Sequence, residues 1–229
     1  MTVVIIGAVA AGTKVAAKLK RELGEDCRVI LLEKQDYISY SGCSLPYFVE
    51  GIIPDYQSLF INTPQDFIDI TGVDLRCDAQ ATEIDRKNKL VTVRYLKTGG
   101  SEKIAYDKLV LAVGAVPIRP PVEGSDLPGT FVLRTPENAA TLKDAVRAGM
   151  KRAVVLGGGA IGLEIAQSLK EQGVRPVVLD MAEQILPGFD KDFAEYVGSC
   201  LMENGIPVFT GEKLTAIRGD GKVEMVFTE

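Results

Sequence analysis

A single cysteine, Cys43, lies between small residues in the stretch 37-YISYSGCSLPYFVEG-51, just before a proline. Structural cysteines usually sit within periodic apolar runs, and this one does not. The stretch instead predicts a loop that leads into a short helix starting near Ser44-Leu-Pro46, because proline favours the first helical turn. A helix N-terminus stabilises a thiolate, so the pattern indicates a reactive thiol at Cys43.

The other three cysteines have no spacing typical of a metal site or a disulfide framework. Cys27 and Cys77 lie beside strand-like runs and Cys200 lies in a helical pattern, so we expect small buried hydrophobic residues at all three. The chain contains no histidine. This excludes Ser-His-Asp hydrolysis, Cys-His proteolysis and histidine-ligated metals, and the sequence predicts no metal site.

A glycine motif, Gly157-x-Gly159-x-x-Gly162, follows a strand-like run over 153–156 and opens a helix that runs to about Gln172. The first glycine permits a tight turn, the second lets a pyrophosphate approach the backbone, and the third lets helix and strand pack closely. Free N–H groups and the positive end of the helix dipole then face the phosphates. This is the pattern of a dinucleotide site.

The same pattern occurs near the N-terminus with one departure. A strand-like run over 3–6 leads to Gly7-Ala-Val9-Ala-Ala-Gly12 and a helical pattern over 11–23. Val9 stands where the middle glycine belongs and would hold a pyrophosphate slightly farther from the backbone. Taken alone, this copy leaves a role in helix–strand packing as the alternative.

In each copy an acid ends the second strand: Glu33 in the first and Asp180 in the second. An acid at this place accepts hydrogen bonds from ribose hydroxyls and repels a 2′-phosphate. Met181 and Ala182 follow Asp180, with no arginine to bind such a phosphate, so we expect NADH rather than NADPH. Two such units predict an α/β chain with two doubly wound nucleotide-binding folds, each with a small antiparallel β-meander.

Between the copies the sequence predicts two alternating strands around a turn at 98–101 and a buried strand over 109–113. Prolines at 117, 120 and 121 indicate a crossover, so we expect a first domain over 1–117 and a second over 118–229. Three further elements are expected after the second copy: a helix over about 191–204, a strand over 206–209 and a hairpin around 219–221.

The composition is that of an ordinary globular protein, with 229 residues, 46% hydrophobic residues and a net charge of −5. No basic run favours a nucleic-acid partner. The longest apolar stretch, Met1–Thr13, is too short to span a bilayer and follows no cationic segment, so neither a membrane span nor a secretory signal is expected. The default location is the cytoplasm.

With these motifs, the chain resembles the pyridine nucleotide–disulfide oxidoreductases over essentially its whole length. Within them it is similar to the branch with one redox cysteine: coenzyme A-disulfide reductases, NADH oxidases and NADH peroxidases. Many relatives use a CxxxxC pair, but here Phe48 stands at the second position. The resemblance therefore implies Cys43 as the catalytic residue, a lone thiol beside a flavin that cycles through a mixed disulfide or a sulfenic acid.

The resemblance also implies an FAD site in the first domain and an NAD(P)H site in the second. The residues implied for FAD are Gly7, Ala8, Val9, Ala10, Ala11, Gly12, Glu33, Lys34, Ala81, Ala112, Val113, Gly114 and Arg134. Those implied for NAD(P)H are Gly157, Gly159, Ala160, Ile161, Gly162, Glu164 and Asp180. Those implied for a coenzyme A-like substrate are Arg21, Ser39 and Gly42, although Gly42 replaces an asparagine often found in relatives. Arg21 is equally typical of a solvated helix surface, and Glu164 of the first turn of a helix.

One position helps to choose within the branch. NADH oxidases and peroxidases typically carry a histidine in the first glycine turn, and this chain has Ala10 there. This favours reduction of a small disulfide or persulfide, with a coenzyme A-based compound as one option. Two alternatives stay open: an NADH oxidase that uses a Cys43 sulfenate, and a nucleotide-binding fragment without turnover. Family members are about twice this length, so we expect the N-terminal portion of a homodimeric protein whose second FAD segment and dimerisation domain lie beyond residue 229.

Overall fold

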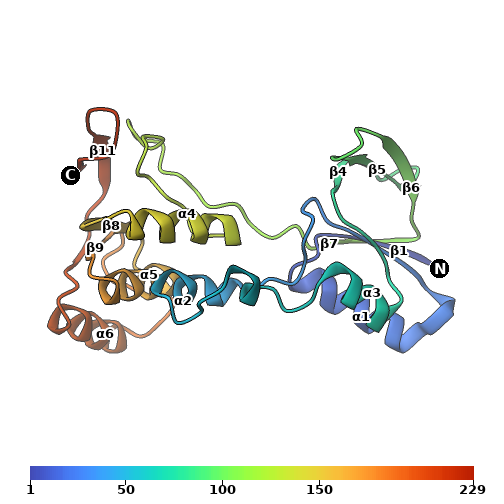
Figure 1. Ribbon diagram of the computed structural model, residues 1–229, viewed down its shortest axis with the longest axis horizontal. Helices are drawn as coiled ribbons and strands as arrows, with labels where there is room; N and C mark the ends of the chain where they lie inside the picture. The colour runs from blue at the N-terminus through green and yellow to red at the C-terminus, as the bar shows by residue number, and fades with distance from the viewer. The chain divides into compact units, whose positions relative to one another are not determined.

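The structure is a computed structural model that describes residues 1–229, and the chain divides into two compact units (Figure 1). Unit 1 comprises Met1–Ser41 and Phe60–Ala115, and unit 2 comprises Gly42–Leu59 and Val116–Glu229. Each unit contains its own parallel sheet.

Unit 1 is built on a four-stranded parallel sheet of strand order β3-β2-β1-β7. Its strands are β1 (Thr2–Ile6), β2 (Arg28–Leu32), β3 (Asp74–Arg76) and β7 (Lys108–Leu111). Its helices are α1 (Ala11–Leu23), the short 3₁₀ turn η1 (Gly24–Asp26) and α3 (Pro64–Thr71). A separate antiparallel sheet contains β4 (Ala79–Asp85), β5 (Leu90–Tyr95) and β6 (Ser101–Ala105).

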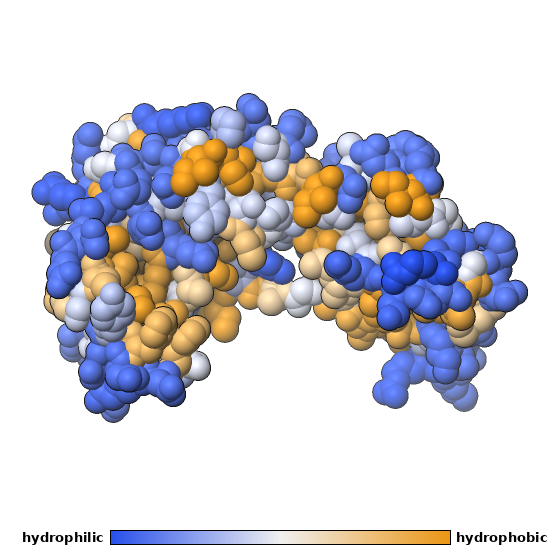
Figure 2. Space-filling model, turned by 90° about the horizontal axis from the view of Figure 1, so that it is seen from below, coloured by the Kyte–Doolittle hydropathy of each residue, from blue (hydrophilic) through white to orange (hydrophobic).

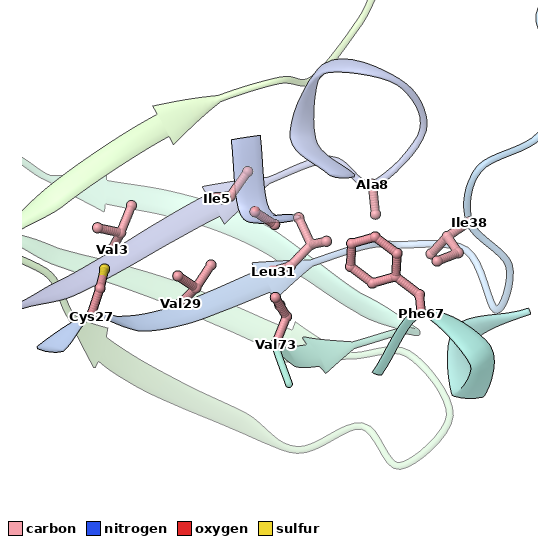
Figure 3. Packing of buried hydrophobic residues seen from close by; sticks show 10 residues of the cluster. Val3, Ile5, Ala8, Cys27, Val29, Leu31, Ile38, Phe67 and Val73 are labelled. Atoms are coloured by element: carbon pink, nitrogen blue, oxygen red, sulfur yellow. The ribbon is translucent and has the colours of Figure 1, made fainter. Parts of the chain in front are cut away.

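The central strands of unit 1 are buried on both faces, which explains why they read as continuous apolar runs. Val3 and Ile5 of β1 pack in one cluster that also contains Phe67 of α3 (Figure 3). Val4 points to the opposite face and packs with Val91 of the antiparallel sheet. The β1 strand is therefore fixed from both sides, and so is the turn that follows it.

Unit 2 contains a three-stranded parallel sheet of order β10-β9-β8 and a hairpin. Its strands are β8 (Arg152–Leu156), β9 (Arg175–Asp180), β10 (Val208–Thr210), β11 (Leu214–Arg218) and β12 (Met225–Thr228). Its helices are η2 (Gly42–Ser44), α2 (Leu45–Glu50), η3 (Tyr56–Leu59), α4 (Pro136–Arg147), α5 (Ala160–Glu171) and α6 (Lys191–Glu203). One core cluster of this unit joins Val178 of β9, Leu163 and Ala166 of α5, and Ala194 of α6.

The segment Gly42–Leu59 belongs to unit 2, although the sequence prediction placed it in a first domain over 1–117. Helix α2 packs against α4 and α5, which accounts for this assignment. The second break, between Ala115 and Val116, lies close to the predicted crossover at residue 117.

The prediction of an α/β chain with two strand–turn–helix–strand units is confirmed, and the differences are two strand ends and one helix. The predicted strand over 109–113 ends at Leu111, and only the N–H of Ala112 continues the ladder, to the carbonyl of Ile6. The predicted strand over 206–209 begins at Val208, because the N–H of Ile206 donates to Leu201 and closes the turn after α6. Helix α3 was not predicted, despite its Pro64 and its Thr63–Asp66 capping box.

Hydrophobic patches interrupt the hydrophilic surface on the face shown in Figure 2. None of the helices combines the length and the apolar character that crossing a bilayer would need.

A substitution of Phe67 in α3 tests the hydrophobic cluster beside the first glycine turn. Phe67 is 6% exposed and packs in the same cluster as Ala8. We expect Phe67→Ala to lower the free energy of unfolding by about 3–5 kcal/mol. Ile70 lies on the same helix but is 75% exposed, so Ile70→Ala should stay within about 0.5 kcal/mol. Urea unfolding followed by circular dichroism measures both, and equal losses would contradict this description of the core.

Candidate functional site

The first glycine turn joins β1 to α1 and needs glycine at both ends. Gly7 has a φ of 101°, and a Cβ there would lie 2.3 Å from the carbonyl oxygen of Ala112. At Gly12 a Cβ would lie 1.7 Å from the carbonyl oxygen of Gly7. No other residue permits this approach of α1 to the turn, so these two glycines have the packing role that the motif predicts.

The second glycine turn, between β8 and α5, repeats this geometry. Gly157 has a φ of 108°, and a Cβ at Gly162 would lie 1.9 Å from the carbonyl oxygen of Gly157. The middle glycine, Gly159, is different, because no atom of the chain lies within 4 Å of a Cβ placed there and its φ of −76° suits any residue. The packing of the protein therefore does not require glycine at position 159. A glycine there is explained if a phosphate group of a ligand lies close to the backbone.

A carboxylate braces each turn, from the buried Glu33 in unit 1 and from the half-buried Asp180 in unit 2. One oxygen of Glu33 accepts a hydrogen bond from the N–H of Ala8 at 2.7 Å, and the other accepts from Gln35 at 3.1 Å. Asp180 does the same in unit 2, accepting from Gly158 at 2.6 Å and from Ala182 at 2.8 Å. The two acids thus hold the residue after the first glycine, a role that the sequence pattern alone did not suggest.

Each of these carboxylates still has acceptor capacity. A carboxylate has about four lone-pair sites, and the backbone N–H groups use two of them. The predicted hydrogen bonds from ribose hydroxyls are therefore compatible with the bracing role of Glu33 and Asp180.

The loop after each second strand returns to the same turn. The N–H of Ser39 donates to the carbonyl of Ala8 at 3.0 Å, and the N–H of Leu186 donates to the carbonyl of Gly158 at 2.9 Å. Ser39 and Leu186 follow their acids by six residues, and both adopt positive φ, 50° and 48°. Ser39, predicted as a substrate residue, is buried and supports the first glycine turn through its backbone.

The remaining residues predicted for FAD lie mostly on or near this turn. Ala10 and Ala11 are exposed at the start of α1, Val9 is half-buried, and Lys34 is exposed directly after Glu33. Ala112 contacts the first glycine turn, and Val113 and Gly114 follow it as exposed residues. Ala81 is half-buried in β4, at an irregularity in its pairing with β5. Arg134 is half-buried in unit 2, two residues before α4.

Two predicted residues lie on exposed helix surfaces. Arg21 is in the last turn of α1 and pairs with its neighbour Glu22 at 3.5 Å. It therefore lies at the opposite end of the helix from the glycine turn, about 15 Å away at 1.5 Å per residue. Glu164 is exposed in the second turn of α5, and Ala160 and Ile161 are exposed at its start.

Cys43 is the only exposed cysteine of the four. It lies in the 3₁₀ turn η2, directly before α2, and the preceding Gly42 is also exposed. Cys27 is buried as expected, whereas Cys77 and Cys200 are only partly buried. Burial, followed by the nearby charge of Glu33, raises the pKa of Cys77 to about 11, so this thiol is protonated at neutral pH. Of the four thiols, Cys43 is therefore the most accessible to a substrate.

The comparisons with known proteins agree with this arrangement. The family model described as pyridine nucleotide-disulphide oxidoreductase matches residues 1–229. The chain belongs to this family.

Among curated relatives, an NADH oxidase of Methanocaldococcus jannaschii is 38% identical over 231 residues, covering 100% of this chain and 51% of the relative. An NAD(P)H sulfur oxidoreductase (CoA-dependent) of Pyrococcus abyssi is 34% identical, covering 100% of this chain and 50% of the relative. The solved structure of an NAD-dependent persulfide reductase from A. fulgidus has a TM-score of 0.91 at 33% identity, covering 100% of this chain and 42% of that chain. The chain thus spans about half the length of the curated relatives it matches.

The bracing role of Glu33 can be tested by substitution. A glutamine has only one carbonyl oxygen, so in Glu33→Gln either Ala8 or Gln35 loses its acceptor inside the unit. We expect the free energy of unfolding to fall by about 1–3 kcal/mol. Glu25→Gln is the control, because its side chain is fully exposed and pairs only with Lys20, and it should cost less than about 1 kcal/mol. Urea unfolding that shows no difference between these variants would contradict the bracing role.

Proposed function

We propose that this chain provides the FAD and NAD(P)H sites of an oxidoreductase that reduces a disulfide or persulfide through Cys43. The observation that carries the proposal is an accessible Cys43 in a chain with two braced glycine turns. Relatives described as sulfur or persulfide reductases support the substrate class.

The two turns fit the two dinucleotides. In unit 1, the backbone after Gly7 and the remaining lone pairs of Glu33 would hold the pyrophosphate and ribose of FAD. In unit 2, the open position at Gly159 and the lone pairs of Asp180 would hold the corresponding groups of NADH. FAD, when bound, supplies a two-electron carrier between NAD(P)H and sulfur.

Cys43 would form and release the covalent intermediate. Its thiolate attacks one sulfur of the substrate RSSR, the S–S bond breaks, and RS⁻ leaves and takes up a proton. Two electrons that originate from NADH then cleave the Cys43 mixed disulfide, regenerate the thiolate and release the second RSH. The balance is NADH + H⁺ + RSSR → NAD⁺ + 2 RSH, and for a persulfide RSSH the products are RSH and H₂S.

Ala10 favours a reductase over an oxidase. It lies exposed in the first glycine turn and has no group that can transfer a proton to a peroxide or to oxygen. The second candidate is an NADH oxidase with a Cys43 sulfenate, which the 38% identity to an NADH oxidase favours. Oxygen uptake without any disulfide, lost in Cys43→Ser, would support that candidate instead.

Replacement of the thiol gives the first test. In the natural full-length protein loaded with FAD, we expect Cys43→Ser to lower the rate of disulfide reduction by about 100-fold or more, because serine cannot form the mixed disulfide. Cys200→Ser, in α6, should retain the wild-type rate. NADH consumption measured with coenzyme A disulfide and with a coenzyme A persulfide decides the point. Equal rates for the Cys43 variant and the wild type would exclude the proposal.

The nucleotide preference gives a second test. We expect kcat/KM to be at least about tenfold higher for NADH than for NADPH, because Asp180 repels a 2′-phosphate. No arginine follows among the neighbouring residues Met181 and Ala182. Initial rates with the two nucleotides at one disulfide concentration measure the ratio. Faster turnover with NADPH would show that Asp180 does not select the cofactor.

A further inference from the structure

Helix α2, which follows the Cys43 turn, is too short to be stable by itself. It has six residues, Leu45–Glu50, whereas isolated helices shorter than about 12–15 residues are marginal in water. Leu45, Phe48 and Val49 are buried, so the position of this helix depends on its neighbours in unit 2. Whatever holds α2 also determines where the preceding turn lies.

The polar contacts that hold α2 lie at its C-terminal end. The hydroxyl of Ser168 in α5 donates to the carboxylate of Glu50 at 3.1 Å, and the side-chain amide of Gln172 donates to the carbonyl of Glu50. From α4, the ammonium of Lys143 lies 3.9 Å from the centre of the Phe48 ring and 3.4 Å from the carbonyl oxygen of Ile53. The contacts of Ser168 and Gln172 fix α2 to α5, and the contact between Lys143 and Phe48 fixes it to α4.

Lys143 is an unusual residue for this place. It is 6% exposed, and it makes no ion pair, having only the ring of Phe48 and one carbonyl oxygen as partners. Burial, and then the charge of Arg147 one turn later, lower the pKa of Lys143, while the charges of Asp55 and Asp144 act in the opposite direction from beyond ion-pair distance. Burying a cation with no carboxylate in contact is unfavourable, and a methionine would fill the space of the stem without that cost. The ammonium therefore contributes something other than packing.

The space around Lys143 is not filled by side chains. Two open pockets, of about 370 and 310 Å³, are both lined by Lys143, Pro54 and Arg147. Next to this space, the directed contacts of the ammonium add a restraint on α2 to the apolar packing of its buried side chains.

We propose that Lys143 is a positioning residue for Cys43: its ammonium holds the C-terminal end of α2 and so fixes the turn that carries the thiol. This inference rests on the proposed function, in which Cys43 attacks the substrate. It assigns to α4 a part in the reaction that the glycine motifs do not indicate. Lys143 itself touches neither substrate nor cofactor in this proposal.

The test uses three variants of the natural full-length protein. Lys143→Met keeps the apolar stem and removes the charge and the donors, whereas Lys143→Arg restores a cation that can stack on Phe48 and donate to Ile53. Arg147→Met removes the same charge from the next turn of α4, where the only ion pair is with Asp144 at 4.0 Å. Thermal melting confirms that each variant is folded.

Three readouts follow the path from Lys143 to the thiol. In Lys143→Met we expect amide hydrogen exchange over residues 45–53 to speed up about tenfold, and the reaction of Cys43 with 5,5′-dithiobis(2-nitrobenzoate) to slow about threefold or more. We expect kcat for disulfide reduction to fall about tenfold with the KM for NADH unchanged. Lys143→Arg should restore all three, and Arg147→Met should behave as the wild type.

The outcomes separate this inference from the proposed function. If Lys143→Met leaves the exchange of residues 45–53 or the Cys43 reaction rate unchanged, the inference is wrong even where the wild type reduces disulfides. If Arg147→Met has the same effect, a general loss of charge explains the result and the inference is again wrong. If the wild type reduces no disulfide but exchange and thiol reactivity shift together, the positioning role stands and the proposed function fails.

Discussion

The structure depends on a carboxylate that holds a glycine turn from the end of the neighbouring strand. In unit 1 the carboxylate of Glu33 accepts a hydrogen bond from the N–H of Ala8, and in unit 2 the carboxylate of Asp180 accepts one from the N–H of Gly158. The turn bends sharply at a glycine with positive φ, and the N–H of the residue after that glycine donates to the carboxylate rather than to a backbone carbonyl. A charged acceptor is a strong substitute for a carbonyl, because hydrogen bonds to charged groups are stronger than those between neutral groups. The same group can then accept from a ribose hydroxyl.

The two units share more of this arrangement than the residues of the glycine motif. In both units the N–H of the first glycine donates, at 2.8 Å, to the carbonyl of the residue before the acid, which is Leu32 in unit 1 and Leu179 in unit 2. In both, a residue six positions after the acid returns to the turn with a positive φ. Val9, in place of the middle glycine, does not disturb this frame, because the frame is made by the residues around it. The departure from the motif therefore concerns the space for a ligand rather than the fold.

The parts of the fold that follow from the sequence are those governed by local rules. The two turns, the helices after them and the strands beside them were predicted, because glycine spacing and apolar runs reflect close approach and burial on both faces. The bracing role of Glu33 was not predicted, because an acid at the end of a strand gives the same sequence pattern whether it binds a ribose or a backbone N–H. Cys43 was singled out by its non-periodic surroundings, and it is exposed in the structure, whereas its reactivity stays a prediction. The assignment of Gly42–Leu59 to unit 2 and the contacts of Lys143 could not be predicted, since they join residues about 90 positions apart or more.

In the proposed reaction, electrons from NADH reach a substrate sulfur by way of Cys43. An anaerobic titration of the natural full-length protein, followed by its visible absorbance, examines this route. NADH should bleach the flavin absorbance, and coenzyme A disulfide or persulfide should restore it in the wild type but not in Cys43→Ser. Restoration by the disulfide in the Cys43→Ser variant, or restoration by oxygen alone, would contradict it.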